Sequence, residues 1–184
     1  MPNEPMDAIA LLKADHRKVE DLFKKFEASR SSEKKQALAQ QICVELAVHA
    51  TIEEEIFYPA CTGEVEDDLI NEAYVEHDGA KVLIAELLAD DVADRFYDAK
   101  MKVLSEAIKH HVHEEEMRSE GLFAQARAAK VDVTALGERM AARKDELLAQ
   151  FKVGGLPALT TRAFTGHELK RGTPIEADAD ATVG

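Results

Sequence analysis

Two stretches of the sequence, "VHATIEEEIFYP" and "HHVHEEEMRSEGLF", each contain a histidine and a glutamate four residues apart within a run of acids. The pairs are His49 with Glu53 and His111 with Glu115. Four residues make about one turn of an α-helix, so the two side chains of each pair lie on the same helix face. The repeat therefore predicts two helices that each present an imidazole and a carboxylate to their neighbours.

Both pairs continue apolar stripes that step by three and four residues, the spacing of a buried seam between packed helices. Burying two carboxylates in such a seam without a partner costs several kcal/mol each. A positive charge is therefore expected between them. The first stripe is formed by Ile42, Leu46, His49, Glu53 and Ile56, and the second by Tyr97, Met101, Leu104, Ile108, His111 and Glu115.

Two further histidines complete a repeat, because His16 and His77 also lie on apolar stripes. His16 precedes His49 by 33 residues and His77 precedes His111 by 34, as in a duplicated helical hairpin. Four neutral imidazoles and two carboxylates that converge in a bundle favour two transition-metal ions, which each carboxylate is able to bridge. Iron suits this ligand set best, since zinc more often has thiolates or a closed shell, and calcium or magnesium avoids imidazole.

Periodic apolar residues predict five main helices joined by short turn-forming segments. Ser32 is the expected N-cap of the second helix and Pro59 follows its end, while Asp132 or Thr134 is the expected N-cap of the last helix. The predicted fold is all-α, an antiparallel up-down-up-down four-helix bundle with an additional C-terminal helix and a flexible tail. The expected helices cover residues 6–26, 32–58, 66–89, 95–118 and 132–151, with a further turn or two over 122–129.

The domain division follows from composition along the chain. Apolar residues make up 46 % and aromatic residues 5 % of the sequence, a balance typical of helical proteins rich in Ala, Leu, Glu and Lys. Residues 1–152 are predicted to form one helical bundle domain. Residues 153–184 lack periodic apolar residues and are predicted to be a disordered C-terminal tail without chemistry of its own.

Charge and cysteine usage limit the partners. The net charge of −13 argues against nucleic acid, because no basic face would outweigh that field. No apolar run approaches the roughly 20 residues that span a bilayer, so no membrane association is expected. Cys43 and Cys61 lie in helical, apolar contexts and are expected to be reduced thiols, which predicts a cytoplasmic location.

Simpler explanations exist for each residue taken alone. A single histidine on an apolar stripe is more often a hydrogen-bonded core residue, and it is the shared spacing of all six that favours a metal site. In the second stretch the pair His110–Glu114 is an alternative to His111–Glu115, which the preceding apolar stripe favours. Tyr74 either belongs to the plain core or points its phenol at the site. The neighbouring acids are expected on a solvated face: Glu54, Glu55, Glu114 and Glu116.

A metal site of this kind has a consequence for stability. Without metal, burial and mutual repulsion are expected to raise the pKa of both Glu53 and Glu115. The metal-free fold would then lose stability as the pH rises and these groups ionise.

The segments "LLKADHRKVEDLF", "ELAVHATIEEEIFYP", "EHDGAKVLIAEL" and "HHVHEEE" together resemble the hemerythrin-like, or HHE cation-binding, proteins over residues 7–129. The resemblance implies a four-helix bundle with a non-haem centre of two iron ions, bridged by two carboxylates and an oxo or hydroxo group. It also implies the residue roles. His16 and His49 would bind one iron, His77 and His111 the other, and the bridging carboxylates would be Glu53 and Glu115.

Two departures from the oxygen-carrying members of that family bear on function. Lys81 stands where the carriers have a further histidine, and Glu115 stands where they use an aspartate with wider spacing. The resemblance therefore implies that the protein binds or reacts with O2, peroxide or nitric oxide in sensing or detoxification, with weak peroxide-decomposing or NO-scavenging activity, rather than carrying oxygen. The alternatives are an iron-binding or iron-homeostasis module without redox turnover, and a purely structural bundle.

Overall fold

The computed structural model describes residues 6–155 and 159–164, and every regular element in that part of the chain is helical. This confirms the all-α helical bundle, whereas the up-down-up-down order of the helices stays a prediction. The elements are α1 (Ala8–Ala28), α2 (Ser32–Ile52), the π-helical turn η1 (Glu53–Phe57), α3 (Tyr58–Cys61), α4 (Asp67–Ala89), α5 (Tyr97–Glu116), α6 (Leu122–Ala128) and α7 (Val133–Gly154).

The caps that begin the helices are short polar side chains. Asp7 accepts a hydrogen bond from the backbone N–H of Ala10 at the start of α1, and Asp132 accepts one from Ala135 at the start of α7. Of the two N-caps expected for the last helix, Asp132 and Thr134, the structure has Asp132. The cap of α2 is Ser31 and not Ser32, because the Ser31 hydroxyl accepts from the N–H of Lys34.

The second helix does not end before Pro59 as predicted. Proline has no N–H to donate, and its ring clashes with the carbonyl four residues earlier in a regular α-helix. Here the chain opens into the π turn η1, where the N–H of Tyr58 donates to the carbonyl of Glu53, and the helix then continues to Cys61. Other helix ends differ from prediction by up to three residues, as at α5, which ends at Glu116 where Met117 turns extended.

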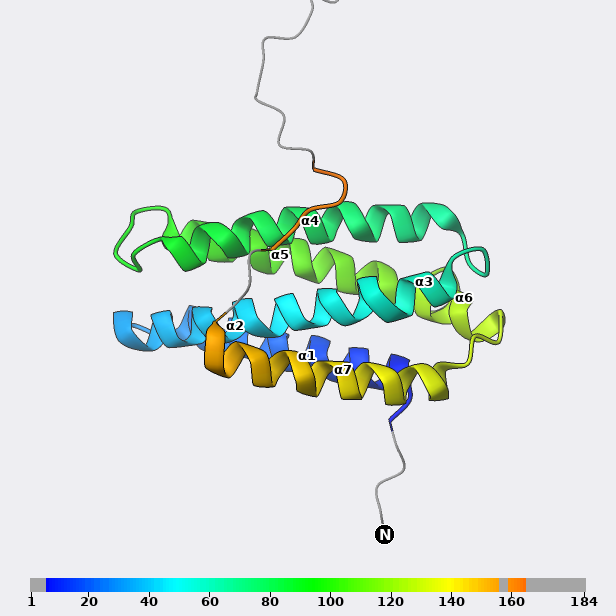
Figure 1. Ribbon diagram of the computed structural model, residues 1–184. Coiled ribbons are helices and arrows are strands. Elements are labelled where there is room, and N and C mark those ends of the chain that lie inside the picture. Colours follow the sequence, from blue (N-terminus) through cyan, green and yellow to red (C-terminus); the bar gives the residue numbers. More distant parts are fainter. Residues whose placement is uncertain (1–5, 156–158, 165–184) are drawn as a thin grey trace, which may run out of the picture.

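The four long helices α1, α2, α4 and α5 pack together, and α7 lies along the outside of α1 and α2 (Figure 1). Buried apolar side chains form two clusters. On α1, Leu12 belongs to one cluster and Val19 to the other, with His16 between them; on α4, Ala73 and Ala80 enclose the next histidine in the same way. A layer of polar side chains therefore lies across the middle of the core.

The part of the predicted tail that the structure describes contacts the bundle. Helix α7 extends to Gly154, and residues 159–164 run across α4 (Figure 1). The boundary at residue 152 stays a prediction, and most of the predicted tail lies outside the described residues.

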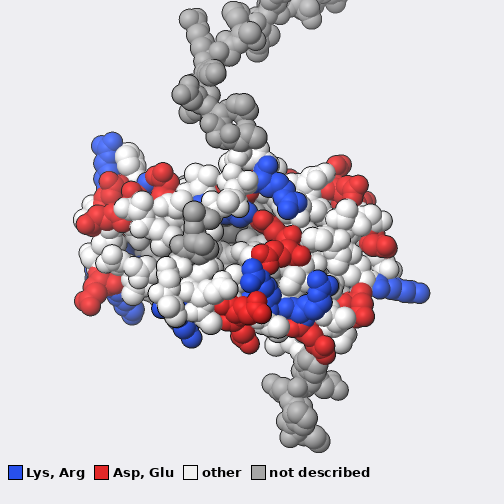
Figure 2. Space-filling view, viewed as in Figure 1, with Lys and Arg blue, Asp and Glu red and all other residues white. Residues whose placement is uncertain are grey.

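On the face formed by α7, α2 and α4, acidic and basic side chains are interspersed (Figure 2). Among the described residues, no helix has the length and hydrophobicity of a membrane span.

Candidate metal centre

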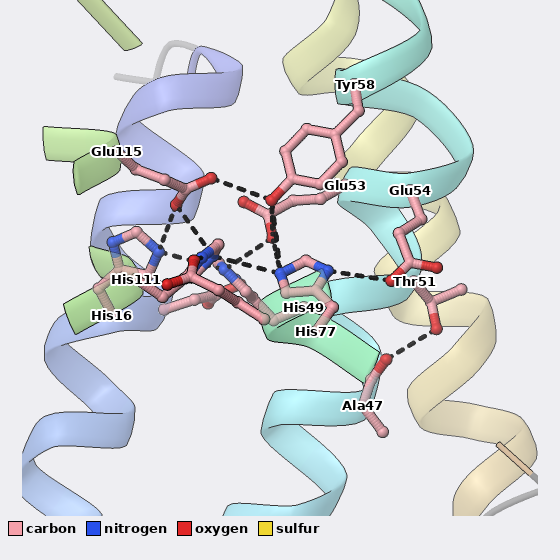
Figure 3. A network of polar contacts seen from close by, with 12 residues as sticks. His16, Ala47, His49, Thr51, Glu53, Glu54, Tyr58, His77, His111 and Glu115 are labelled. Carbon is pink, nitrogen blue, oxygen red and sulfur yellow. Dashed lines mark hydrogen bonds and ion pairs between the residues drawn. The ribbon is translucent and has the colours of Figure 1, made fainter. Parts of the chain in front are cut away.

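The six predicted site residues meet in the polar layer between the two apolar clusters (Figure 3). Each is at most 6 % exposed. The histidines form two pairs. His16 and His49 bring their Nε2 atoms to 3.1 Å, and His77 and His111 bring theirs to 3.2 Å. The structure thus reproduces the pairing expected for two metal ions, although ligation itself stays a prediction.

Each glutamate lies between the two histidine pairs. Glu53 Oε2 is 3.1 Å from His49 Nε2 and 3.3 Å from His77 Nε2. Glu115 Oε2 is 3.4 Å from His16 Nε2 and 3.6 Å from His111 Nε2. A carboxylate that faces one histidine of each pair is placed to bridge two ions, which is the role the sequence predicts for both residues.

The protonation pattern of the imidazoles fits metal ligation. Three histidine Nδ1 atoms each lie 2.7–3.0 Å from a carboxylate oxygen, so in the neutral ring the proton sits on Nδ1 and the lone pair of Nε2 points inward. Opposed lone pairs and carboxylate oxygens repel unless cations or protons lie between them. In addition, Glu53 Oε1 and Glu115 Oε2 are buried without a hydrogen-bond partner among the described residues. The donor set therefore suits two divalent or trivalent transition-metal ions.

The centre has a strongly negative potential. Burial disfavours the charged form of His49, but Glu53 and Asp15 outweigh it and raise the pKa of His49 to about 10. Burial likewise opposes charge on His77, and Glu53 and Glu54 raise its pKa to about 9. Burial would raise the pKa of Glu53, yet His49 and His77 hold it well below its usual value. Without metal, protons therefore neutralise this site, and metal binding must displace them.

Two acids expected on a solvated face instead contact the predicted ligands. Glu54 accepts from His77 Nδ1 at 3.0 Å and Glu116 from His16 Nδ1 at 2.8 Å. Glu76 accepts from His111 Nδ1 at 2.7 Å, and Asp15 Oδ2 lies 3.7 Å from His49 Nδ1, an ion-pair distance. The prediction was wrong for Glu54 and Glu116 because helix periodicity gives the direction of a side chain but not the neighbour it meets.

The register of α5 is His111–Glu115. Both side chains are buried, whereas the His110 side chain is 62 % exposed and pairs with Glu114 on the surface. Glu55 also behaves as expected, since it forms an exposed ion pair with Arg143.

Tyr58 is a site residue that the sequence analysis missed. Its hydroxyl donates to Glu115 Oε1 at 3.1 Å and lies 3.3 Å from Glu53 Oε2 (Figure 3). In a regular α-helix five residues rotate a side chain about 140° beyond a full turn, away from Glu53. The π turn η1 bonds Tyr58 to Glu53 across five residues and brings both to the interior. In the sequence, the run of acids that precedes Pro59 was the available signal for a break in the regular helix at this point.

Tyr74 does not reach the centre. Its ring packs edge-on against Tyr58, with centroids 5.3 Å apart, and the Arg162 guanidinium lies 4.0 Å from its ring centroid. The core alternative for Tyr74 is the one that the structure supports.

Tyr58→Phe is expected to preserve the fold and the metal while changing the absorption spectrum of the metal-loaded protein. Burial and the carboxylates of Glu115 and Glu53 raise the pKa of Tyr58 well above its usual value, so the phenol is a proton donor. Its loss leaves Glu115 Oε1 unpaired, at a cost of about 1–3 kcal/mol in the metal-free protein. Thermal melting and absorption spectra measure both effects. Tyr74→Phe is the control, and an equal change in both variants would contradict the assignment.

Replacing both cysteines with alanine is expected to leave metal content unchanged. Cys43 and Cys61 are free and buried, and neither sulfur belongs to a group of convergent ligand atoms among the described residues. Burial raises the pKa of each thiol to about 12, so neither supplies a thiolate at neutral pH. Metal analysis of the double variant checks this, and a loss of metal would place sulfur in the site.

A small cavity of about 20 Å³ adjoins the histidines. All four imidazoles line it, and its other walls are largely apolar, with Val19, Leu46, Ala80, Ile84 and Ile108 among them. This volume holds about one water-sized molecule.

Two curated proteins are similar to this chain in sequence. A protein from Nostoc sp. (strain PCC 7120) named DNA nickase is 28 % identical over 113 residues, 61 % of this chain; the chain spans about a third of the nickase, 32 % of its length. The uncharacterized protein Rv2633c from Mycobacterium tuberculosis is 27 % identical over 143 residues, 77 % of this chain and 88 % of that protein.

A solved structure is similar in fold. The crystal structure of a hemerythrin HHE cation binding domain-containing protein, the Rv2633c homolog from Mycobacterium kansasii, matches with a TM-score of 0.66 and 25 % identity. The match covers 82 % of this chain and 94 % of that one.

The family comparison agrees with the geometry of the site. The Hemerythrin HHE cation binding domain matches residues 7–126, a span that includes all six convergent histidines and glutamates. Cation binding follows from this membership, and the buried histidine and glutamate cluster fits a metal site. The chain belongs to the hemerythrin HHE cation binding domain family.

Proposed function

We propose that this chain is a non-haem di-iron protein that binds or reacts with O2, peroxide or nitric oxide in sensing or detoxification. The support is the two histidine pairs with a carboxylate between them on each side, a set of nitrogen and oxygen donors that suits iron. When bound, a pair of iron ions supplies Lewis acidity and redox equivalents for such small molecules. The chain's own residues determine which molecules reach it.

The observation that carries the proposal is the cavity. It has a volume of about 20 Å³ and the four imidazoles face it, so a molecule inside it contacts the ligand layer directly. Space for about one water-sized molecule admits diatomic species and peroxide and excludes organic substrates. The cavity's largely apolar walls, with Asp15 and Lys81 the charged exceptions, favour small uncharged molecules.

Lys81 supports turnover over reversible oxygen carriage. Its ammonium group donates to both carboxylate oxygens of Glu54, at 2.7 and 2.9 Å, so this side chain is paired and supplies no further imidazole to the centre. Among the described residues, four imidazoles face the centre, so fewer protein donors would hold a bound metal than with a histidine in place of Lys81. Tyr58 holds a proton 3.1 Å from Glu115 Oε1 and would be the proton donor of the buried centre.

The test is to load the protein anaerobically with Fe²⁺ and mix it separately with air, hydrogen peroxide and nitric oxide. We expect peroxide or nitric oxide to be consumed faster than with metal-free protein. We also expect Ala80→Val, which narrows the cavity without removing a ligand, to slow consumption at unchanged iron content. A long-lived oxygen adduct that is released under vacuum would contradict the proposal, and iron uptake without consumption would favour iron homeostasis.

The remaining parts of the proposal concern location and partners. Two free thiols support a cytoplasmic location. The likeness to a nickase does not extend the proposal to DNA, because it covers a third of that protein and a net charge of −13 opposes binding to phosphates.

A further inference from the structure

Two lysines reach the carboxylates that face the histidine rings, and both are largely buried. The Lys144 side chain on α7 is 17 % exposed and the Lys81 side chain on α4 is 10 % exposed. Buried lysines are uncommon unless paired. Each one here pairs with a carboxylate that faces a histidine Nδ1.

Lys144 connects α7 to His49. Its ammonium donates to Asp15 Oδ1, and Asp15 Oδ2 faces His49 Nδ1 at 3.7 Å. Neither Asp15 Oδ2 nor His49 Nδ1 has a hydrogen-bond partner among the described residues. Lys144 thus holds a carboxylate that faces this imidazole.

The sequence of α7 explains how Lys144 arrives there. Gly137, Met140, Lys144 and Leu147 follow one another in steps of three and four, so Lys144 lies on the face that packs inward. A Cβ atom at Gly137 would lie 2.4 Å from the backbone oxygen of Met6, so glycine is required for α7 to approach the start of α1.

A second chain of contacts begins at residues 159–164 and ends at His77. The N–H groups of Arg162, Ala163 and Phe164 donate to Asp78 Oδ2, at 2.8, 2.5 and 3.1 Å. The other oxygen of this fully buried carboxylate lies 3.5 Å from the Lys81 ammonium. Lys81 holds Glu54, whose Oε1 accepts from His77 Nδ1 at 3.0 Å.

Both chains of contacts act on the same side of the centre. His49 and His77 are the two histidines that flank Glu53, one from each pair. On the other side, Arg17 of α1 holds Glu116 beside His16, and Glu76 of α4 holds His111. The Glu115 side is therefore supported from within the bundle, whereas the contacts on the Glu53 side also reach segments after residue 126, where the family match ends.

We propose that α7 and residues 159–164 are part of the metal centre, where Lys144, and Asp78 acting through Lys81, are positioning residues that hold His49 and His77 and slow metal release. The proposal rests on the metal binding proposed above. The physical reason is charge compensation. Without its lysine a buried carboxylate loses the ammonium group that holds it in place, and the imidazole that it faces then loses a fixed orientation.

The experiment uses the full chain loaded with Fe²⁺ or Co²⁺. We expect Lys144→Met to release iron to a chelator roughly 10–100-fold faster than the unmodified protein, the range found when residues that orient metal ligands are removed. The visible spectrum of the Co²⁺ form, which reports ligand geometry, should change as well. Asp78→Ala should do the same to a smaller extent, and Lys144→Arg should restore slow release.

Arg143→Met is the matched control. Arg143 precedes Lys144 on α7 but pairs with exposed Glu55, which lies outside the convergent ligand groups. A release rate and Co²⁺ spectrum of Lys144→Met equal to those of Arg143→Met would overturn the inference and leave the proposed function intact. An unmodified protein that binds neither metal would overturn both. If Lys144→Met does not fold, Asp15→Asn breaks the same link from α1 and is judged by the same two measurements.

Discussion

Replacing His49 or His111 with alanine is expected to remove most of the bound metal, starting from close to two iron ions per chain in the unmodified protein. Each substitution deletes one of the four Nε2 atoms that converge at 3.1–3.2 Å in pairs. Loss of a residue that only orients a ligand already costs roughly 10–100-fold in metal affinity, and loss of the ligand itself should cost at least as much. Metal analysis after gel filtration in the presence of a mild chelator measures the effect.

The choice of these two histidines makes the prediction specific. They belong to different pairs, so each variant should lose one ion more completely than the other, and both should lose activity. His113→Ala is the control, because His113 lies two residues from His111 on the same helix and is exposed. Full metal occupancy in both site variants, or equal losses in the control, would show that the convergent histidines are not the ligands.

Metal removal is expected to lower the melting temperature at neutral pH by roughly 5–10 °C, since ligand at 100 times its dissociation constant contributes about 2.7 kcal/mol to a domain of this size. The physical cause is the negative centre. Glu53 is completely buried and ionised beside His49 and His77, and without metal only protons on those rings compensate its charge. Calorimetry of the metal-free and loaded forms measures the difference.

The metal-free protein should lose stability as the pH rises. The pKa values of His49 and His77 are raised from an ordinary value of about 6.5 to about 10 and about 9, so the folded state binds protons more tightly than the unfolded state. Their contribution is complete below pH 6.5 and is lost as the pH rises through 9 and 10. Glu53 has a lowered pKa, so its contribution is present above about pH 4.5 and is lost in acid.

The cause of this pH dependence differs from the one expected from the sequence. The expected direction, lower stability at higher pH without metal, is retained, but His49 and His77 outweigh the effect of burial and lower the pKa of Glu53. Denaturant unfolding of the metal-free protein at pH 6 and pH 9 tests whether charged histidines are the cause of this pH dependence. Equal stability at both values, or a maximum at the higher pH, would show that the histidines are not charged in the metal-free fold.

The bundle and the ligand layer could be predicted from sequence because both depend on helical periodicity. Steps of three and four residues place His49 with Glu53 and His111 with Glu115 on the apolar faces of their helices, and this spacing can be read from each helix alone. The same stripes continue as the apolar clusters on either side of the site, so one pattern determined both the core and the inward direction of the ligands.

The tertiary structure alone decided the features that do not follow from regular helix geometry or from neighbouring residues along the chain. The π turn before Pro59 rotates Tyr58 into the site, which an ideal helix would not do. The partners of the imidazole Nδ1 atoms come from other helices, and Lys144 contacts Asp15 across 129 residues of sequence. Periodicity fixes the side of a helix on which a residue lies, but only the packing of helices against one another determines which charges meet there.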